Sequence, residues 1–408
     1  MSKGARVAVV VLALLAFAGG FLGVAGALYL TQPAVHGSTQ VVPFEVKKGD
    51  TANAVGQRLQ DAGLIRNALV FRLLAKYRHL DTQLEPGVYQ LSPAMTMDAI
   101  IQKLLHGQPD EQLITIPPGH RVAEYPDYFS ALQNFDAKNF LKVAQTGVLK
   151  DGTKLSSMYW YLPSKQANTV DALEGYLFPN TYYFNSSDDE QQVIEKLLIN
   201  LGEQLCPGPA DQPDQYISDQ AQCKAHGAKV GKTGNIFTEM EQHFNTTNDV
   251  LALYDTLTLS SIVVREVKYV QDIPGIADVY YNRYSIMANG TYLTPGNDTI
   301  VGFEADPTVQ YARDTDSGPD AKTGQYWDKL ADGGRNVDPN GIYNTYTHKG
   351  LMPGPIAAPR WEDIVGIATA NEPTASPNFW FVNDCHGTTY YASTYAQFQT
   401  IVGKACQG

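Results

Sequence analysis

A single carboxylate interrupts an apolar helical stripe in the second half of the chain. In "SSIVVREVKYV" (260–270), the apolar neighbours three and four residues from Glu266 are Ile262, Val263, Tyr269 and Val270. Such neighbours would exclude water from the carboxyl and raise its pKa. A carboxylic acid that stays protonated near neutral pH can donate a proton to the leaving oxygen when a glycosidic bond breaks. A structural role is the alternative, with an ion pair from this carboxylate to Arg265, Arg283 or Lys268.

Other polar and aromatic side chains are of the types that bind sugars. Asp306 in "ADPTV" is the candidate for a second carboxylate, although Asp-Pro-Thr is also a common start of a helix. Asn282 in "YNRY" could bind an acetamido group or cap buried backbone. Glu174 in "LEGYLFP" could orient a sugar or fix a turn. Aromatic faces and an amide, for which packing in the core is the alternative, come from Tyr176, Tyr343, Asn344 and Tyr346.

Length and composition indicate a folded protein with more than one domain. The 408 residues are too many for one ordinary core, and 44% of them are hydrophobic. The net charge of −12 argues against a nucleic-acid partner, since phosphate binding requires clusters of Lys and Arg that the sequence does not show. The 24 Tyr residues offer flat apolar faces with hydroxyl groups, which suit contact with sugars or peptides.

The first part of the chain predicts a membrane anchor. Residues 7–31 follow Lys3 and Arg6 and contain a run of about 24 apolar or small residues, which is long enough to span a bilayer. We expect residues 1–6 in the cytoplasm and the chain from residue 40 onward on the outside. A cleaved signal peptide is the alternative, because "AGA" at 25–27 resembles a cleavage site.

The cysteines agree with an oxidising compartment. Cys206 and Cys223 bracket a stretch rich in Pro, Gln and Asp, and Cys385 and Cys406 bracket the last predicted strand and helix. Two local disulfides are therefore the simplest arrangement, although the sequence does not choose among the three possible pairings. A zinc site is disfavoured, because no "CxxC" and no His at ligand spacing accompanies the cysteines.

The hydrophobic patterns beyond the anchor predict an α+β fold. A polar linker (32–42) precedes a small module (43–110) with the order strand, helix, helix, strand, helix. The remaining residues (111–408) form a larger α+β catalytic domain. This domain is expected to contain a strand pair at 173–184, an insertion stapled by a disulfide at about 205–235, a helix from about 248 to 270, and a closing hairpin followed by a short helix.

Several motifs in a fixed order resemble a known family. They are "LEGYLFPNTYYF", "LTLSSIVVREV", "VYYNRY", "ADPTVQYA", "YNTYTHKGLMPGPIAAP", "FWFV" and "STYAQF". Together they resemble the endolytic murein transglycosylases, also called the MltG or YceG-like family, over nearly the whole chain from Phe44. Residues 43–107 are similar to the LysM-like module of that family. The chain departs from the family pattern at Val264, where a second Glu is frequent, and at "TTYY" in the last hairpin, where H-x-F is usual.

The resemblance implies an activity and a location. It implies a single-pass protein of the bacterial cytoplasmic (inner) membrane with a LysM-like module and an extracytoplasmic catalytic domain. It implies cleavage of nascent peptidoglycan strands between N-acetylmuramic acid and N-acetylglucosamine, which leaves 1,6-anhydromuramyl ends, with Glu266 as the catalytic residue. Peptidoglycan polymerases (penicillin-binding proteins) are the implied partners, and no metal or organic cofactor is implied.

One carboxylate is enough for this reaction. Protonated Glu266 would donate to the glycosidic oxygen and, once ionised, would take a proton from the muramyl C6 hydroxyl as that oxygen closes on C1. Two other functions stay open. In a hydrolytic muramidase, Asp306 would activate water. In a non-catalytic glycan-binding or scaffold protein, the LysM-like module and a Tyr-rich cleft would hold strands without cutting them.

Overall fold

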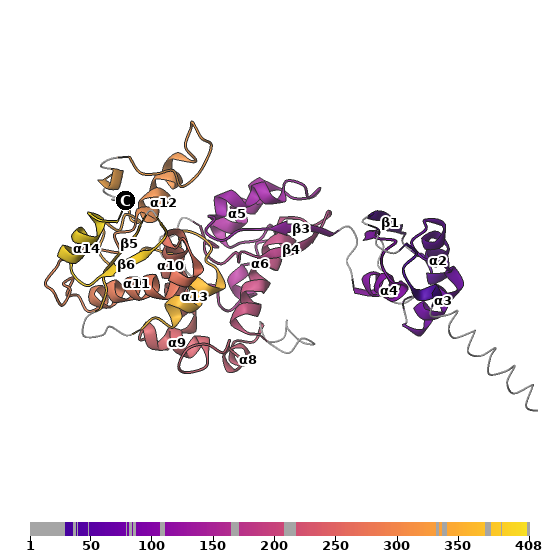
Figure 1. Ribbon diagram of the computed structural model, residues 1–408, viewed down its shortest axis with the longest axis horizontal. Coiled ribbons are helices and arrows are strands. Elements are labelled where there is room, and N and C mark those ends of the chain that lie inside the picture. Colours follow the sequence, from indigo (N-terminus) through magenta and orange to yellow (C-terminus); the bar gives the residue numbers. More distant parts are fainter. Residues whose placement is uncertain are drawn as a thin grey trace, which may run out of the picture. The chain divides into compact units, whose positions relative to one another are not determined.

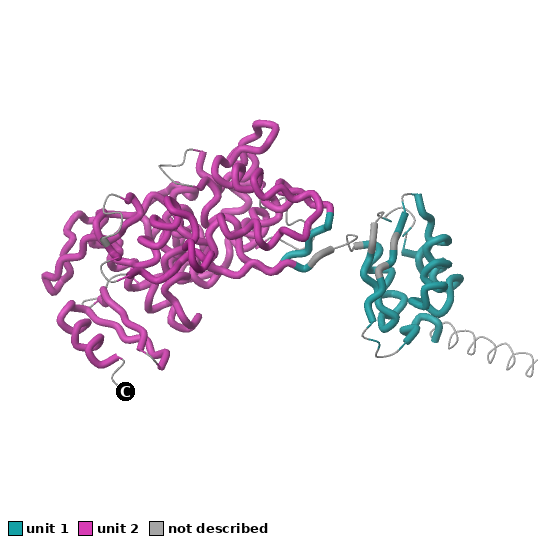
Figure 2. The backbone as a smooth tube through the Cα atoms, turned by 90° about the horizontal axis from the view of Figure 1, so that it is seen from above, with its two compact units in different colours: residues 1–113, 182–186 teal, residues 114–181, 187–408 magenta. Residues whose placement is uncertain are grey.

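The computed structural model divides the chain into two compact units (Figures 1 and 2). The small unit comprises residues 1–113 with 182–186, and the large unit comprises residues 114–181 with 187–408. The residues that the structure describes are 29–35, 38, 40–47, 49–78, 80, 84, 87–106, 111–164, 171–207, 218–331, 334–336, 341–371, 377–384 and 386–405.

The small unit folds around a two-stranded antiparallel sheet. β1 (Val42–Val46) pairs with β2 (Gly87–Leu91), and Phe44 lies opposite Tyr89. Both aromatic side chains are buried in a core that also receives apolar residues from three helices. The order strand, helix, helix, strand, helix is the one that the sequence predicts. The helices are α2 (Ala52–Asp61), α3 (Ala68–Tyr77) and α4 (Met97–His106).

The motif "LEGYLFPNTYYF" forms a buried turn and one strand, so the predicted strand pair at 173–184 is wrong. Within this stretch, which the structure describes throughout, the only strand is β4 (Thr181–Asn185), and it pairs with β3 (Glu111–Thr115). The chain turns at Gly175, whose φ of +81° is incompatible with an extended strand. The apolar side chains before β4 are all buried in this turn: Leu173, Tyr176, Leu177 and Phe178.

The large unit is mainly helical (Figure 1). The antiparallel hairpin of β5 (Trp380–Asn383) and β6 (Thr389–Ala392), followed by a short helix, confirms the predicted end of the chain. Its α-helices are α5 (Ala137–Thr146), α6 (Glu190–Leu205), α8 (Gln220–Ala225), α9 (Ile236–His243), α10 (Asp249–Glu266), α11 (Ile273–Ala288), α12 (Asp306–Ser317), α13 (Trp361–Ala368) and α14 (Tyr395–Val402). Its short 3₁₀ helices are η2 (Val122–Phe129), η3 (Leu155–Ser157), η4 (Val270–Asp272) and η5 (Gly334–Asn336).

The helix that ends at the candidate catalytic residue lies at the centre of the large unit. α10 packs against α9, α11, α12 and α13, and it is buried around most of its circumference rather than along one stripe. Buried hydroxyl groups of α10 donate hydrogen bonds to the backbone of their own helix. The hydroxyl of Thr256 donates to Ala252 O and that of Ser260 donates to Thr256 O, both over 2.7 Å. The helix ends at Glu266 rather than at the predicted residue 270, because Val267 adopts an extended conformation.

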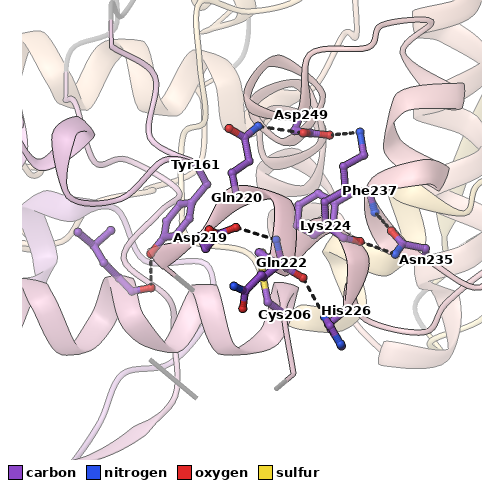
Figure 3. The surroundings of a disulfide bond; sticks show 12 residues. Tyr161, Cys206, Asp219, Gln220, Gln222, Lys224, His226, Asn235, Phe237 and Asp249 are labelled. Atoms are coloured by element: carbon purple, nitrogen blue, oxygen red, sulfur yellow. Dashed lines mark hydrogen bonds and ion pairs between the residues drawn. A yellow bond between two sulfur atoms is a disulfide. The ribbon is translucent and has the colours of Figure 1, made fainter. Parts of the chain in front are cut away.

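The predicted insertion at about 205–235 is tied to the start of α10 (Figure 3). Cys206 and Cys223 form a disulfide with their Cα atoms 5.1 Å apart. On the same short helix, α8, Lys224 Nζ lies 2.9 Å from an oxygen of Asp249, and Gln220 Nε2 donates to the other oxygen over 3.0 Å. The second predicted cysteine pair, Cys385 and Cys406, lies outside the described residues.

The predicted membrane anchor at 7–31 lies outside the described residues except for positions 29–31, which are helical. Among the residues that the structure describes, no helix combines the length and the apolar character needed to cross a bilayer.

Candidate active site

Glu266 borders an open cavity of about 470 Å³ in the large unit. The residue is the last of α10, and its side chain is partly buried. The walls come from α10, α11, the start of α12, two loops, β5 and α14, which are widely separated in sequence. The lining residues are Arg265, Glu266, Tyr280, Arg283, Glu304, Asp306, Pro307, Gln310, Arg335, Tyr346, Trp380, Phe381, Tyr395 and Phe398.

The surroundings of Glu266 favour its protonated form. Loss of solvent is the largest cause that raises the pKa of Glu266 from 4.5 to about 7, and the carboxylate of Asp306 adds to the rise. The guanidinium groups of Arg283 and Arg265 and a hydrogen bond with Tyr280 oppose it. The C-terminal end of α10, where unpaired carbonyls gather, also disfavours a negative charge. Near neutral pH, Glu266 can therefore both donate and accept a proton.

The groups that shield Glu266 differ from those predicted. Because α10 ends at this residue, Tyr269 and Val270 do not continue its stripe and are 40% and 51% exposed. Tyr280 on α11 is only 2% exposed and lies against the carboxyl instead. The Tyr280 ring packs edge-on against Phe381, with ring centres 6.0 Å apart. The side chains that exclude water from the Glu266 carboxyl thus come from α11 and from the C-terminal hairpin.

Arg283 of α11 brings a buried positive charge to the cavity. Its Nε donates to Phe379 O over 2.7 Å, and its Nη1 donates to Phe303 O. The same Nη1 lies 3.5 Å from a carboxylate oxygen of Glu304. These contacts fix the guanidinium in place, so it can stabilise Glu266 when that carboxyl ionises.

Arg265 stacks on the indole ring of Trp327. Its Nη1 donates to Gly119 O over 3.1 Å, and its guanidinium carbon lies 4.1 Å from the centre of the Trp327 ring. The indole nitrogen of Trp327 donates to Glu124 over 3.0 Å. Trp327 has a φ of +70°, an uncommon value for a bulky residue, so the fold keeps this ring in place at a cost in backbone strain.

Asp306 is the second carboxylate of the cavity. It is the first residue of α12, and its Oδ1 accepts hydrogen bonds from the hydroxyl of Tyr346 over 2.7 Å and from Arg335 Nε over 2.8 Å. Both bonds hold the carboxylate of Asp306 in place on the wall of the cavity. The cavity therefore holds an acid at Glu266 and a hydrogen-bonded carboxylate at Asp306.

Two loops must meet to bring Asp306 and Tyr346 together. Thr345 joins them, because its Oγ1 accepts from Ala305 N over 3.1 Å and lies 2.8 Å from Thr308 Oγ1. The backbones approach so closely that a Cβ on Gly302 would lie 2.3 Å from Thr345 O. Only glycine fits at this point.

Four aromatic side chains form the wall contributed by the end of the chain. Trp380 and Phe381 come from β5, and Tyr395 and Phe398 come from α14. The ring centres of Trp380 and Tyr395 are 6.0 Å apart, and those of Tyr395 and Phe398 are 6.1 Å apart. Aromatic faces of this kind pack against the apolar faces of sugar rings.

Glu174 lies outside the cavity lining and holds the turn of its motif. Its two carboxylate oxygens accept from the amide of Val122 over 3.1 and 3.2 Å, and one of them also accepts from the hydroxyl of Tyr311 over 3.3 Å. Burial raises the pKa of Glu174 well above its ordinary value. Tyr311 belongs to α12, the helix that begins with Asp306. Glu174 therefore supports the position of this helix and does not face the cavity itself.

The predicted amide residues also bind backbone rather than line the cavity. Asn282 Nδ2 donates to Asn378 O over 2.9 Å. Asn344 Nδ2 donates to Arg335 O over 3.0 Å, and its Oδ1 accepts from the amide of Tyr346 over 3.0 Å. Asn344 therefore positions two residues that reach Asp306. Two further predicted residues are buried away from the lining: Tyr176 and Tyr343.

Of the predicted site residues, the structure brings Glu266, Asp306 and Tyr346 together in the cavity. Arg283, predicted as a possible ion-pair partner of Glu266, also lines the cavity, whereas Tyr280 was not predicted although it lies in the same motif, "VYYNRY". Arg335 lies in the short 3₁₀ helix η5, in a stretch without periodicity, and no signal in the sequence marks it. In the part of the chain that the structure describes, no group of three or more His, Cys, Asp or Glu side chains is arranged to hold a metal ion.

Known proteins match the chain over most of its length. Relatives named endolytic murein transglycosylase come from Streptococcus pneumoniae serotype 2 (strain D39 / NCTC 7466), 27% identical over 398 residues, and Bacillus subtilis (strain 168), 25% identical over 375 residues. These matches cover 94% and 90% of this chain, and 62% and 85% of the respective relatives, so the chain spans about three fifths of the pneumococcal protein. A 2.6 Å crystal structure of a yceG-like protein from Listeria monocytogenes is 23% identical, with a TM-score of 0.48, over 89% of this chain and 100% of that chain. Residues 44–404 match the YceG-like family, and the chain therefore belongs to that family.

Proposed function

We propose that this protein is a lytic transglycosylase that cuts peptidoglycan strands endolytically, between N-acetylmuramic acid and N-acetylglucosamine, and leaves 1,6-anhydromuramyl ends. The observation that carries the proposal is the carboxyl of Glu266, with a pKa of about 7, on the wall of an open cavity of about 470 Å³. This volume is within the usual range for ligand pockets. The name that the relatives from S. pneumoniae and B. subtilis carry supports the same activity.

In the first step, Glu266 acts as the general acid. Its protonated carboxyl donates a proton to the glycosidic oxygen while the bond from that oxygen to the muramyl C1 breaks. The carboxylate that remains is stabilised by the positive charges of Arg283 and Arg265 and by the hydrogen bond with Tyr280. The positive charge that develops at C1 lies in a cavity that also holds Asp306, whose carboxylate favours it electrostatically.

In the second step, the same residue acts as the general base. The ionised Glu266 accepts the proton of the muramyl C6 hydroxyl as that oxygen forms a bond to C1, which restores the acid and consumes no water. Because the nucleophile belongs to the same sugar, proximity replaces an activated water molecule. The aromatic wall of Trp380, Tyr395 and Phe398 would hold the sugar rings during both steps.

The location and partners belong to the same proposal. The apolar run at 7–31 would anchor the chain in the bacterial cytoplasmic membrane, with the chain from residue 40 onward on the extracytoplasmic side. The small unit would serve as a LysM-like module, a proposal supported by its β1-α2-α3-β2 order with antiparallel strands. Peptidoglycan strands would be the substrate, and penicillin-binding proteins would be membrane partners that supply it.

Replacement of the acid by its amide tests the activity. Glu266→Gln keeps the shape of the side chain but can neither donate nor accept the required proton, so release of anhydromuropeptides from purified glycan should fall by at least about a thousandfold. Glu362→Gln, an exposed position in the first turn of α13, is the matched control and should retain full activity. Equal product yield from Glu266→Gln and the unsubstituted chain would remove Glu266 from the mechanism.

A hydrolytic muramidase is the second candidate, because Asp306 lies in the same cavity as Glu266. Two carboxylates are the usual equipment of glycoside hydrolases, with one as acid and the other as base. The hydrogen bonds that Asp306 accepts from Tyr346 and Arg335 weigh against this role, since both occupy Oδ1 and leave less of the carboxylate free to bind an attacking water. The two functions differ in whether water enters the product.

A further inference from the structure

The second helix of the small unit, α3, exposes an apolar stripe. Leu69, Leu73 and Tyr77 are 54%, 61% and 79% exposed, and their spacing of four residues aligns them along one side of the helix. Scattered exposed apolar residues are ordinary on a protein surface, but an aligned row is typical of a surface that binds something.

The exposed stripe belongs to a well-packed helix and is not a partly unfolded part of the core. The opposite side of α3 carries Phe71 and Ala75, both completely buried, and the helix begins with a side-chain cap in which Asn67 Oδ1 accepts from Val70 N over 3.0 Å. The helix is therefore fixed by its own packing, and its outer side has no role in the core of the small unit.

Basic residues interleave with the stripe. Arg72 and Lys76 are exposed on the same helix at positions adjoining Leu69 and Leu73, and α3 contains no acidic residue. This composition contrasts with the net charge of −12 for the whole chain. A helix face that combines basic and apolar side chains suits the boundary between anionic headgroups and acyl chains.

The chain enters the small unit beside the start of this helix. The guanidinium of Arg66 donates to Pro33 O over 2.9 and 2.7 Å and lies 4.3 Å from the centre of the Tyr29 ring. The amide of Val35 donates to Pro93 O over 3.0 Å. The segment that follows the apolar run at 7–31 is thus fastened to the small unit next to α3, which would bring this helix near the bilayer.

We propose that the outer face of α3, formed by Leu69, Arg72, Leu73, Lys76 and Tyr77, lies on the surface of an anionic lipid bilayer. The inference rests on the proposed anchor for its proximity to the membrane, and it adds a second contact that fixes how the small unit faces the bilayer. The apolar side chains reach below the headgroups, and the two cations pair with lipid phosphates. The small unit would then bind the membrane surface through α3 in addition to the proposed anchor.

Photo-crosslinking of the full chain in proteoliposomes that contain phosphatidylglycerol tests this contact. Benzoylphenylalanine in place of Leu73 should form adducts with lipid at least fivefold more than benzoylphenylalanine in place of Gln57, an exposed position on α2. Adducts from position 73 to residues 114–408, to another protein, or to lipid at the same yield as position 57 would each overturn the proposal.

Charge reversal gives a second readout with a matched control. Arg72→Glu with Lys76→Glu should reduce the lipid adducts from position 73 about tenfold, whereas Lys138→Glu with Lys142→Glu, an exposed pair of equal spacing on α5, should not. An equal fall in both variants would overturn a local contact. Extraction at alkaline pH examines the anchor separately: a chain that stays in the vesicles but forms no lipid adducts at position 73 refutes the α3 contact and leaves the anchor intact.

Discussion

Replacing Asp306 by Asn should lower the pKa of Glu266 and move the alkaline limb of the pH profile. The two side chains share one cavity, and the negative charge of Asp306 is the second cause, after burial, that raises the pKa of Glu266 from 4.5 to about 7. Asp306→Asn removes that charge and frees Arg335, whose cation also acts on Glu266. Both effects favour the ionised form, so the pKa should fall.

The size of the change follows from the order of the causes. Burial is the larger contribution to the raised pKa of Glu266 and survives the substitution, so less than half of the rise should be lost, which corresponds to about one pH unit. The activity needs protonated Glu266, and it is therefore present below the pKa and lost above it. At pH 7 the protonated fraction should fall from about one half to about one tenth.

The assay is kcat/KM for release of anhydromuropeptides between pH 5 and pH 9, which reports the pKa of the acid in the free enzyme. The alkaline limb should lie at about pH 7 for the unsubstituted chain and near pH 6 for Asp306→Asn. Asp316→Asn, an exposed position on the same helix, is the control and should leave the limb in place. An unmoved limb in Asp306→Asn would refute the electrostatic coupling, and loss of activity at every pH would indicate that Asp306 itself reacts.

Three further predictions concern stability, read as shifts in the urea midpoint of the large unit. Glu174→Ala should cost about 2 kcal/mol, because a buried backbone amide loses its acceptor; an unchanged midpoint would contradict this role. Gly175→Ala should cost at least about 1 kcal/mol more than Gly152→Ala, since both have positive φ but only at Gly175 would a Cβ lie 2.5 Å from a proline ring; equal costs would contradict it. Cys206→Ser with Cys223→Ser should cost up to ~3 kcal/mol, because the disulfide closes a loop of 17 residues; a midpoint matching the oxidised chain would count against it.

Local patterns were enough to predict most helices and the closing hairpin. They also singled out Glu266, but the physical reason differs from the one the stripe suggested. The periodicity continued through Tyr269, whereas the helix ends at Glu266, and the shielding comes from Tyr280 on another helix. The alternation in "LEGYLFPNTYYF" predicted a strand pair, but the first half of this motif forms a turn at Gly175. That turn buries the same apolar residues that a strand would bury, so the sequence pattern does not separate the two structures.

The remaining walls of the cavity depend on contacts between segments far apart in the sequence. Asp306 meets Tyr346 because Gly302 lets two backbones approach and Thr345 joins them. Arg335 reaches Asp306 from η5, where Asn344 donates a hydrogen bond to the carbonyl of Arg335. Contacts between such distant segments leave no periodic pattern in the sequence. The sequence therefore identified residue types that bind sugars, but it did not show which of them line the cavity and which position the residues of its walls.

The most direct test of the central claim, that Glu266 serves as acid and then as base with no water consumed, is mass analysis of the products formed in ¹⁸O-labelled water. The account predicts anhydromuramyl ends that are one water lighter than reducing ends and carry no ¹⁸O. Reducing muramic acid with ¹⁸O at C1 as the main product would contradict the account, because water rather than the C6 hydroxyl would then have attacked the sugar.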